Sequence, residues 1–112
     1  MKATRQSVYD AIDGERDYQH KACIERGWTE SKSLGEFILT ISGLVEKAKD
    51  EWYIESDSNP INTLHNIRKL AAVAVAALEG HGAPTRNFVK EIQAEVIADP
   101  ADKGEKMFFK KE

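Results

Sequence analysis

Residues 63–86 read TLHNIRKLAAVAVAALEGHGAPTR, from Thr63 to Arg86. Apolar residues recur along the first part of this stretch at spacings of three and four, which places them on one stripe of a helix. Alanine and valine fill most of the remaining circumference, and a helix that is apolar nearly all round packs inside a bundle. Gly80 is a typical helix stop. The stretch therefore predicts a buried central helix that ends near Gly80.

Three further helices are predicted around the central one. They cover residues 4–26, 34–53 and 84–98. Thr4 is a suitable N-cap for the helix that follows it, and Gly27 is the expected stop. Ser33 and Glu36 have the spacing of a capping box, in which each side chain bonds the backbone N–H of the other residue. These signals predict an all-α fold, a four-helix, bundle-like single domain over residues 1–98.

Residues 99–112 form a charged C-terminal tail that carries the apolar run Met107-Phe108-Phe109. Apolar side chains on a polar tail suggest docking, either on this chain or on a partner.

Composition excludes several classes of function. The net charge of -3 gives no reason to expect a duplex nucleic acid partner, because such proteins present a concentrated basic surface. A single cysteine, Cys23, cannot form an intrachain disulfide, and this favours a cytoplasmic protein. The first residues lack the apolar core of a signal peptide, and the apolar run from Leu70 to Leu78 is too short to span a bilayer. We therefore expect no membrane partner.

Cations and aromatic residues suggest a site for a phosphorylated ligand. Cations near helix ends hold phosphate together with backbone N–H groups, and exposed aromatic rings stack bases. The candidate nucleotide-binding residues are Arg16, Tyr18, Trp28, Arg68, Lys69, His81 and Arg86. The alternative for the polar residues around Tyr18 is a solvated helix face. Gly80 and Gly82 flank the candidate His81, and the alternative is that this segment only forms a helix stop and a tight turn.

A metal site is the competing hypothesis for the polar residues. Glu46 and Asp50 lie one helical turn apart, a spacing at which two carboxylates can bind one Mg²⁺ ion. The facing part of the central helix, however, offers the cations Arg68 and Lys69, which repel a divalent ion. Glu46 and Asp50 are the candidate metal ligands, and Mg²⁺ is the cofactor expected if the protein is an enzyme.

Four sequence segments together resemble a known family. They are Glu15-Arg16-Asp17-Tyr18-Gln19, Leu34-Gly35-Glu36-Phe37, residues 67–72 (IRKLAA) and residues 79–86 (EGHGAPTR). This combination resembles small phage and prophage proteins that are similar to the MazG-like, all-α nucleoside triphosphate pyrophosphohydrolases. The resemblance covers about residues 7–86. It implies a four-helix arrangement in which the subunits of a homo-oligomer enclose a nucleotide.

The chain departs from that family at the metal motifs. The resemblance implies an E-E-x-x-E motif on the second helix, where this chain has Ser42, Gly43 and Glu46. It implies E-x-x-D on the third helix, where this chain has Asn66 and Lys69. Loss of acids with gain of a cation favours nucleotide binding, such as sequestration, over hydrolysis.

Two other hypotheses stay open. One is a divergent magnesium-dependent nucleoside triphosphate pyrophosphohydrolase that uses Glu15, Glu36, Glu46 and Asp50. The other is a phage protein that inhibits a host factor in the host cytoplasm, through its acidic surface or its apolar tail.

Overall fold

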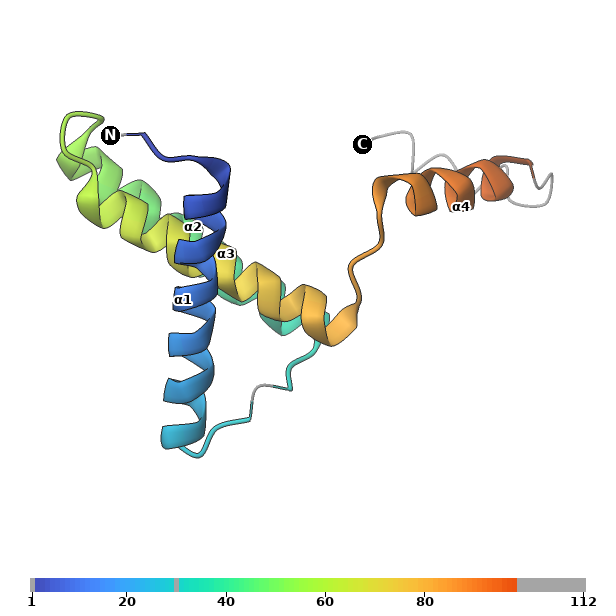
Figure 1. Ribbon diagram of the computed structural model, residues 1–112, viewed down its shortest axis with the longest axis horizontal. Coiled ribbons are helices and arrows are strands. Elements are labelled where there is room, and N and C mark those ends of the chain that lie inside the picture. The colour runs from blue at the N-terminus through green and yellow to red at the C-terminus, as the bar shows by residue number, and fades with distance from the viewer. Residues whose placement is uncertain (1, 30, 99–112) are drawn as a thin grey trace. The chain divides into compact units, whose positions relative to one another are not determined.

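The computed structural model describes residues 2–29 and 31–98. Within these residues the protein is all-helical, as predicted, and contains no strand. The helices are α1 (Arg5–Glu25), α2 (Leu34–Glu55), α3 (Ile61–His81) and α4 (Arg86–Ala98) (Figure 1). The predicted docking segment Met107-Phe108-Phe109 lies outside the described residues.

The chain divides into two compact units, Met1–Gly82 with α1 to α3 and Ala83–Glu112 with α4. In the first unit, α2 and α3 lie side by side and α1 crosses α3 (Figure 1). No helix in the described part of the chain combines the length and the apolar character that a membrane span requires.

The predicted caps of α1 and α2 are confirmed. Thr4 Oγ1 accepts a hydrogen bond from the Ser7 amide at 3.1 Å, and Gly27 adopts a φ of 70° directly after α1. At α2, Ser33 Oγ accepts from the Glu36 amide at 3.1 Å, and the Glu36 carboxylate accepts from the Ser33 amide at 2.7 Å. These hydrogen bonds with Ser33 hold the pKa of Glu36 below its usual value.

The sequence offers Asn62 or Thr63 as the cap of the central helix. In the structure a carboxylate at the end of the preceding helix caps α3 instead. The helix begins at Ile61, and Glu55 at the end of α2 accepts hydrogen bonds from the amides of Asn62 and Thr63, both at 2.9 Å. The Thr63 hydroxyl donates to the same carboxylate at 2.8 Å. Burial alone would raise the pKa of Glu55, but these hydrogen bonds outweigh it, so its pKa lies below the usual value. A carboxylate at a helix N-terminus also interacts favourably with the helix dipole.

The central helix α3 is only partly covered within the first unit. Thr63, Asn66 and Ala77 are buried, and Ala72 is fully covered. Leu64 on the same helix remains 44% exposed. The expectation of a helix buried on all sides is therefore wrong for this unit, because α1 and α2 leave part of its circumference open.

Two groups of apolar residues are more exposed than their types predict. A tryptophan directly after a helix stop is expected to anchor its loop on the core, because a buried indole contributes much stability, but Trp28 is 64% exposed. In α4, the Thr85 hydroxyl accepts from the Phe88 amide at 3.1 Å and starts the helix. Helical spacing predicts that Phe88 and Ile92 lie on the inward face of this helix, but within the described residues they are 54% and 44% exposed.

Candidate anion-binding cleft

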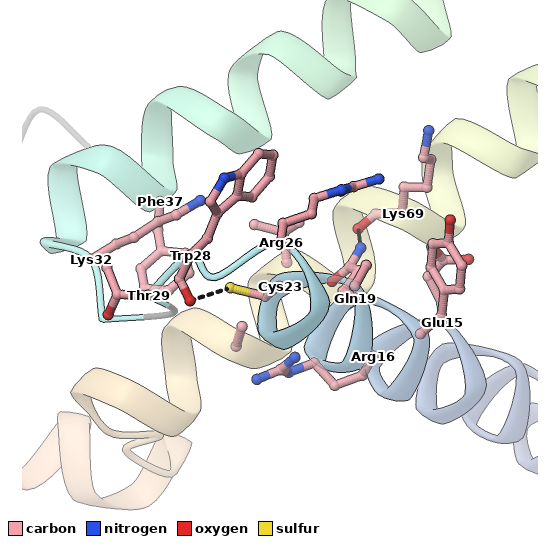
Figure 2. A pocket seen from close by; sticks show the side chains of 14 residues that line it. Glu15, Arg16, Gln19, Cys23, Arg26, Trp28, Thr29, Lys32, Phe37 and Lys69 are labelled. Atoms are coloured by element: carbon pink, nitrogen blue, oxygen red, sulfur yellow. Dashed lines mark hydrogen bonds between the residues drawn. The ribbon is translucent and has the colours of Figure 1, made fainter.

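A cleft of about 360 Å³ lies in the first unit, between α1, α3 and the segment that joins α1 to α2 (Figure 2). Its lining combines cationic, aromatic and small apolar side chains. The lining residues are Glu15, Arg16, Tyr18, Gln19, Ala22, Cys23, Arg26, Trp28, Thr29, Lys32, Phe37, Lys69, Val73 and Ala76.

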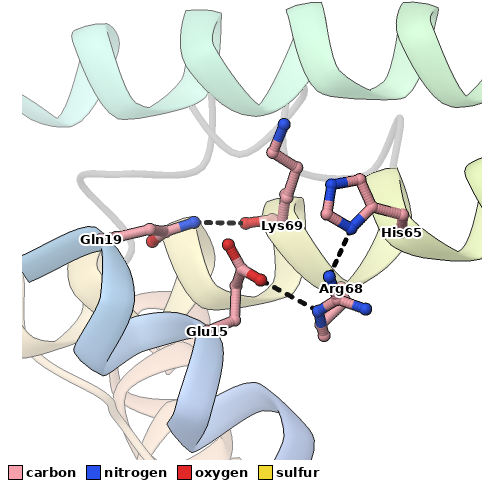
Figure 3. Close-up of polar contacts among 5 residues, drawn as sticks. All are labelled: Glu15, Gln19, His65, Arg68 and Lys69. Carbon is pink, nitrogen blue, oxygen red and sulfur yellow. Dashed lines mark hydrogen bonds and ion pairs between the residues drawn. The ribbon is translucent and has the colours of Figure 1, made fainter. Parts of the chain in front are cut away.

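Polar contacts between α1 and α3 set the width of the cleft. Glu15 pairs with Arg68 at 2.9 Å, and Gln19 Nε2 donates to the Lys69 carbonyl at 3.2 Å (Figure 3). Arg16, the residue after Glu15, pairs with Glu79 near the C-terminal end of α3 at 2.8 Å. Each contact joins residues more than 45 positions apart, so helix spacing alone could not predict which residues pair.

Three of the cations are available to a ligand. Among the residues that the structure describes, Arg26, Lys32 and Lys69 form no ion pair with an acid. Arg26 lies over the Trp28 ring at 5.0 Å, and Lys32 lies 5.8 Å from the Phe37 ring centre. Such cation–π contacts hold a cation in place without neutralising its charge. The cleft therefore presents an excess of positive charge.

Two exposed aromatic rings border the same hollow. Tyr18 is 63% exposed and Trp28 is 64% exposed. The half-buried Cys23 donates from its Sγ to the Trp28 carbonyl at 3.3 Å and fixes the turn that presents the indole (Figure 2). A planar ligand group can therefore stack on a ring next to cationic side chains.

The structure gathers part of the predicted nucleotide site. Arg16, Tyr18, Trp28 and Lys69 all line the cleft. Arg68 does not line it, because its guanidinium bonds Glu15 and also His65 Nδ1 (Figure 3).

The other two predicted cations lie elsewhere. His81 Nε2 donates to the Lys32 carbonyl at 2.9 Å and meets the Phe37 ring edge-on. It therefore contacts two residues that line the cleft. Arg86 begins α4 in the second unit.

The sequence prediction missed two cations. Arg26 is the C-cap residue of α1, at the end of the predicted helix, and Lys32 lies in the loop between α1 and α2. The closeness of Arg26 to Trp28 in sequence was the available signal, because arginine often stacks on a nearby indole.

The acidic residues of the enzyme hypothesis lie in separate parts of the structure and bond different partners. Glu15 pairs with Arg68, Glu36 is held in the capping box, and Glu46 pairs with Lys49 at 3.1 Å. The hydrogen bond and charge of Glu46 raise the pKa of Lys49. In the described ranges, no three or more His, Cys, Asp and Glu side chains form a group that could hold a metal ion.

Asp50, the other proposed metal ligand, borders a second hollow of about 290 Å³ between α2 and α3. The remaining lining residues are Lys47, Glu51, Asn62, His65 and Asn66. Glu46 is not among them, so the structure does not bring the two proposed metal ligands to one hollow.

Comparison of the chain with known protein families, with curated proteins and with solved structures finds no match.

Proposed function

We propose that this protein binds a phosphorylated nucleotide in the anion-binding cleft. The observation that carries the proposal is the meeting of Lys69, Arg26 and Lys32 with two exposed aromatic rings in one hollow. The cations match the negative charge of phosphate groups, and the rings match the flat face of a base. A cleft of about 360 Å³ is within the range of small-molecule sites.

Binding is favoured over hydrolysis by the surroundings of the acids. Glu15, Glu36 and Glu46 each have a cation or a helix cap as partner. A magnesium-dependent pyrophosphohydrolase would need such carboxylates to converge on the phosphates. The likeness to MazG-like phage proteins, the homo-oligomer and sequestration of the nucleotide all belong to this same proposal.

Calorimetric titration with ATP tests the site residue by residue. Lys69→Gln is expected to raise the Kd about 10- to 100-fold, because a hydrogen bond to a charged group contributes about 1.5–3 kcal/mol. Lys21→Gln is the matched control, because Lys21 is exposed on α1 and does not line the cleft. Equal affinities for the two variants would refute the cleft as the phosphate site.

The enzyme alternative has its own outcome. If the protein releases pyrophosphate only with Mg²⁺, and Glu46→Gln abolishes this release, the protein is the hydrolytic enzyme and the binding proposal is wrong.

A further inference from the structure

One carboxylate oxygen in the anion-binding cleft has no partner. The Glu15 side chain is 9% exposed, and its Oε1 accepts from Arg68 Nε at 2.9 Å (Figure 3). Its other oxygen, Oε2, bonds no group in the part of the chain that the structure describes. Water still reaches Oε2, because every fully buried polar side-chain atom in the described ranges has a partner. Since Glu15 lines the cleft, the free oxygen faces the cleft.

The position of this carboxylate limits what it can bind. Phosphate groups repel a carboxylate, so Glu15 must contact another part of a phosphorylated ligand. About three helical turns, or about 16 Å along α1, separate Glu15 from Arg26. Figure 2 shows Glu15 and Lys69 at one end of the cleft and Lys32 at the other. The end near Arg26 and Lys32 is therefore free for phosphates, and Glu15 marks the opposite end.

Gln19 adds a second polar group beside Glu15. It lies one turn further along α1, so both side chains are on the same helix face. Gln19 Nε2 donates one hydrogen to the Lys69 carbonyl at 3.2 Å, which holds the amide in place (Figure 3). Its second N–H and its Oε1 have no partner among the described residues. Glu15 and Gln19 together offer acceptors and a donor to a ligand.

Sugar hydroxyls fit this combination. Each hydroxyl both donates and accepts, so one of two neighbouring hydroxyls can donate to Glu15 Oε2 while the other bonds the Gln19 amide. Acidic side chains bind ribose hydroxyls in this way in dinucleotide-binding folds. The edge of a guanine base is a poorer fit. Its two adjacent N–H groups would pair with both oxygens of a carboxylate, and Arg68 already holds Oε1 of Glu15.

We propose that Glu15 and Gln19 bind the ribose hydroxyls of the ligand, so that the cleft selects ribonucleotides over 2′-deoxyribonucleotides. This inference rests on the proposed function and names the class of nucleotide. Tyr18 lies one turn from Glu15 and also lines the cleft, so its ring can stack the base that the sugar carries. Lys69 meets the phosphate next to the sugar.

Calorimetric titration of the full chain with ATP and with 2′-deoxy-ATP, both without Mg²⁺, tests the sugar contact. Wild type is expected to bind 2′-deoxy-ATP about 10-fold more weakly, because a hydrogen bond to a charged group is lost. Glu15→Gln should bring the two affinities within about threefold, since its neutral amide accepts more weakly. Asp17→Asn is the matched control and should keep the full difference, because Asp17 is exposed on α1 and does not line the cleft.

The outcomes separate this inference from the proposed function. Equal wild-type affinities for the two nucleotides would overturn the sugar contact and leave nucleotide binding intact. The same is true if Glu15→Gln keeps the full difference, or if it tightens both nucleotides alike, because the carboxylate would then face the phosphates. No affinity for either nucleotide would overturn the proposed function itself. Far-UV circular dichroism checks folding, and Gln19→Leu replaces Glu15→Gln if that variant loses helix content.

Discussion

Phe37→Ala is expected to destabilise the first unit more than any truncation on the surface of α2. Phe37 is 6% exposed, and the other buried apolar residues in the described chain are alanines. Its ring packs edge-on against His81, at a distance of 5.9 Å between ring centres, and so joins the start of α2 to the end of α3.

The size of the stability loss in Phe37→Ala follows from the burial of the ring. Removal of a buried phenylalanine ring costs about 3–5 kcal/mol. Phe37 borders the cleft, so water can enter the space that the ring leaves, and we expect the low end, about 3 kcal/mol. A domain of this size has a total stability of only about 5–15 kcal/mol, so this loss is a large fraction of it.

Urea unfolding followed by circular dichroism measures this loss. Leu39→Ala is the control, two residues away on the same helix and 73% exposed, and should cost less than about 0.5 kcal/mol. If the two variants lose similar stability, the packing of α2 against α3 described above is wrong.

Two further perturbations test the polar contacts. Glu15→Gln should cost about 1–2 kcal/mol, since its side chain is 9% exposed while Arg68 is 36% exposed, and Asp17→Asn on the exposed side of α1 should be neutral in the same urea titration. Glu55→Gln should lower the melting temperature at pH 7. Because the folded-state pKa of Glu55 lies below 4.5, its carboxylate stabilises the fold above that pH, and the difference from wild type should disappear as the pH falls through the folded pKa. A difference that persists at the lowest pH would contradict the role of the charged cap.

Local signals predicted the helices well. The helix ends depend on residues that are close together in the sequence, namely Thr4 and Gly27 at α1, and Ser33 with Glu36 at α2. The sequence pattern is therefore enough to predict these ends. The cap of α3 was missed because Glu55 reaches it from the preceding helix, with the turn between them.

Packing and the cleft were harder to predict because they depend on contacts between distant parts of the chain. Apolar composition shows that α3 should be covered, but it does not show whether this chain or a second copy provides the cover. Lys69 and Trp28 were recognised as ligand-binding types, and the fold brings them to one hollow. Arg68 was expected beside them, yet a long-range ion pair with Glu15 occupies it, and no spacing rule contains that information.

Thermal melting of the wild-type protein with ATP, with adenosine and with inorganic triphosphate, each with and without Mg²⁺, tests the central claim most directly. A ligand that binds only the folded state raises the melting temperature by mass action. We expect the largest shift with ATP and a smaller one with triphosphate, both without Mg²⁺, because the cations and the aromatic rings each contribute. No shift with any phosphorylated ligand, or a shift only when Mg²⁺ is present, would contradict metal-independent nucleotide binding in the cleft.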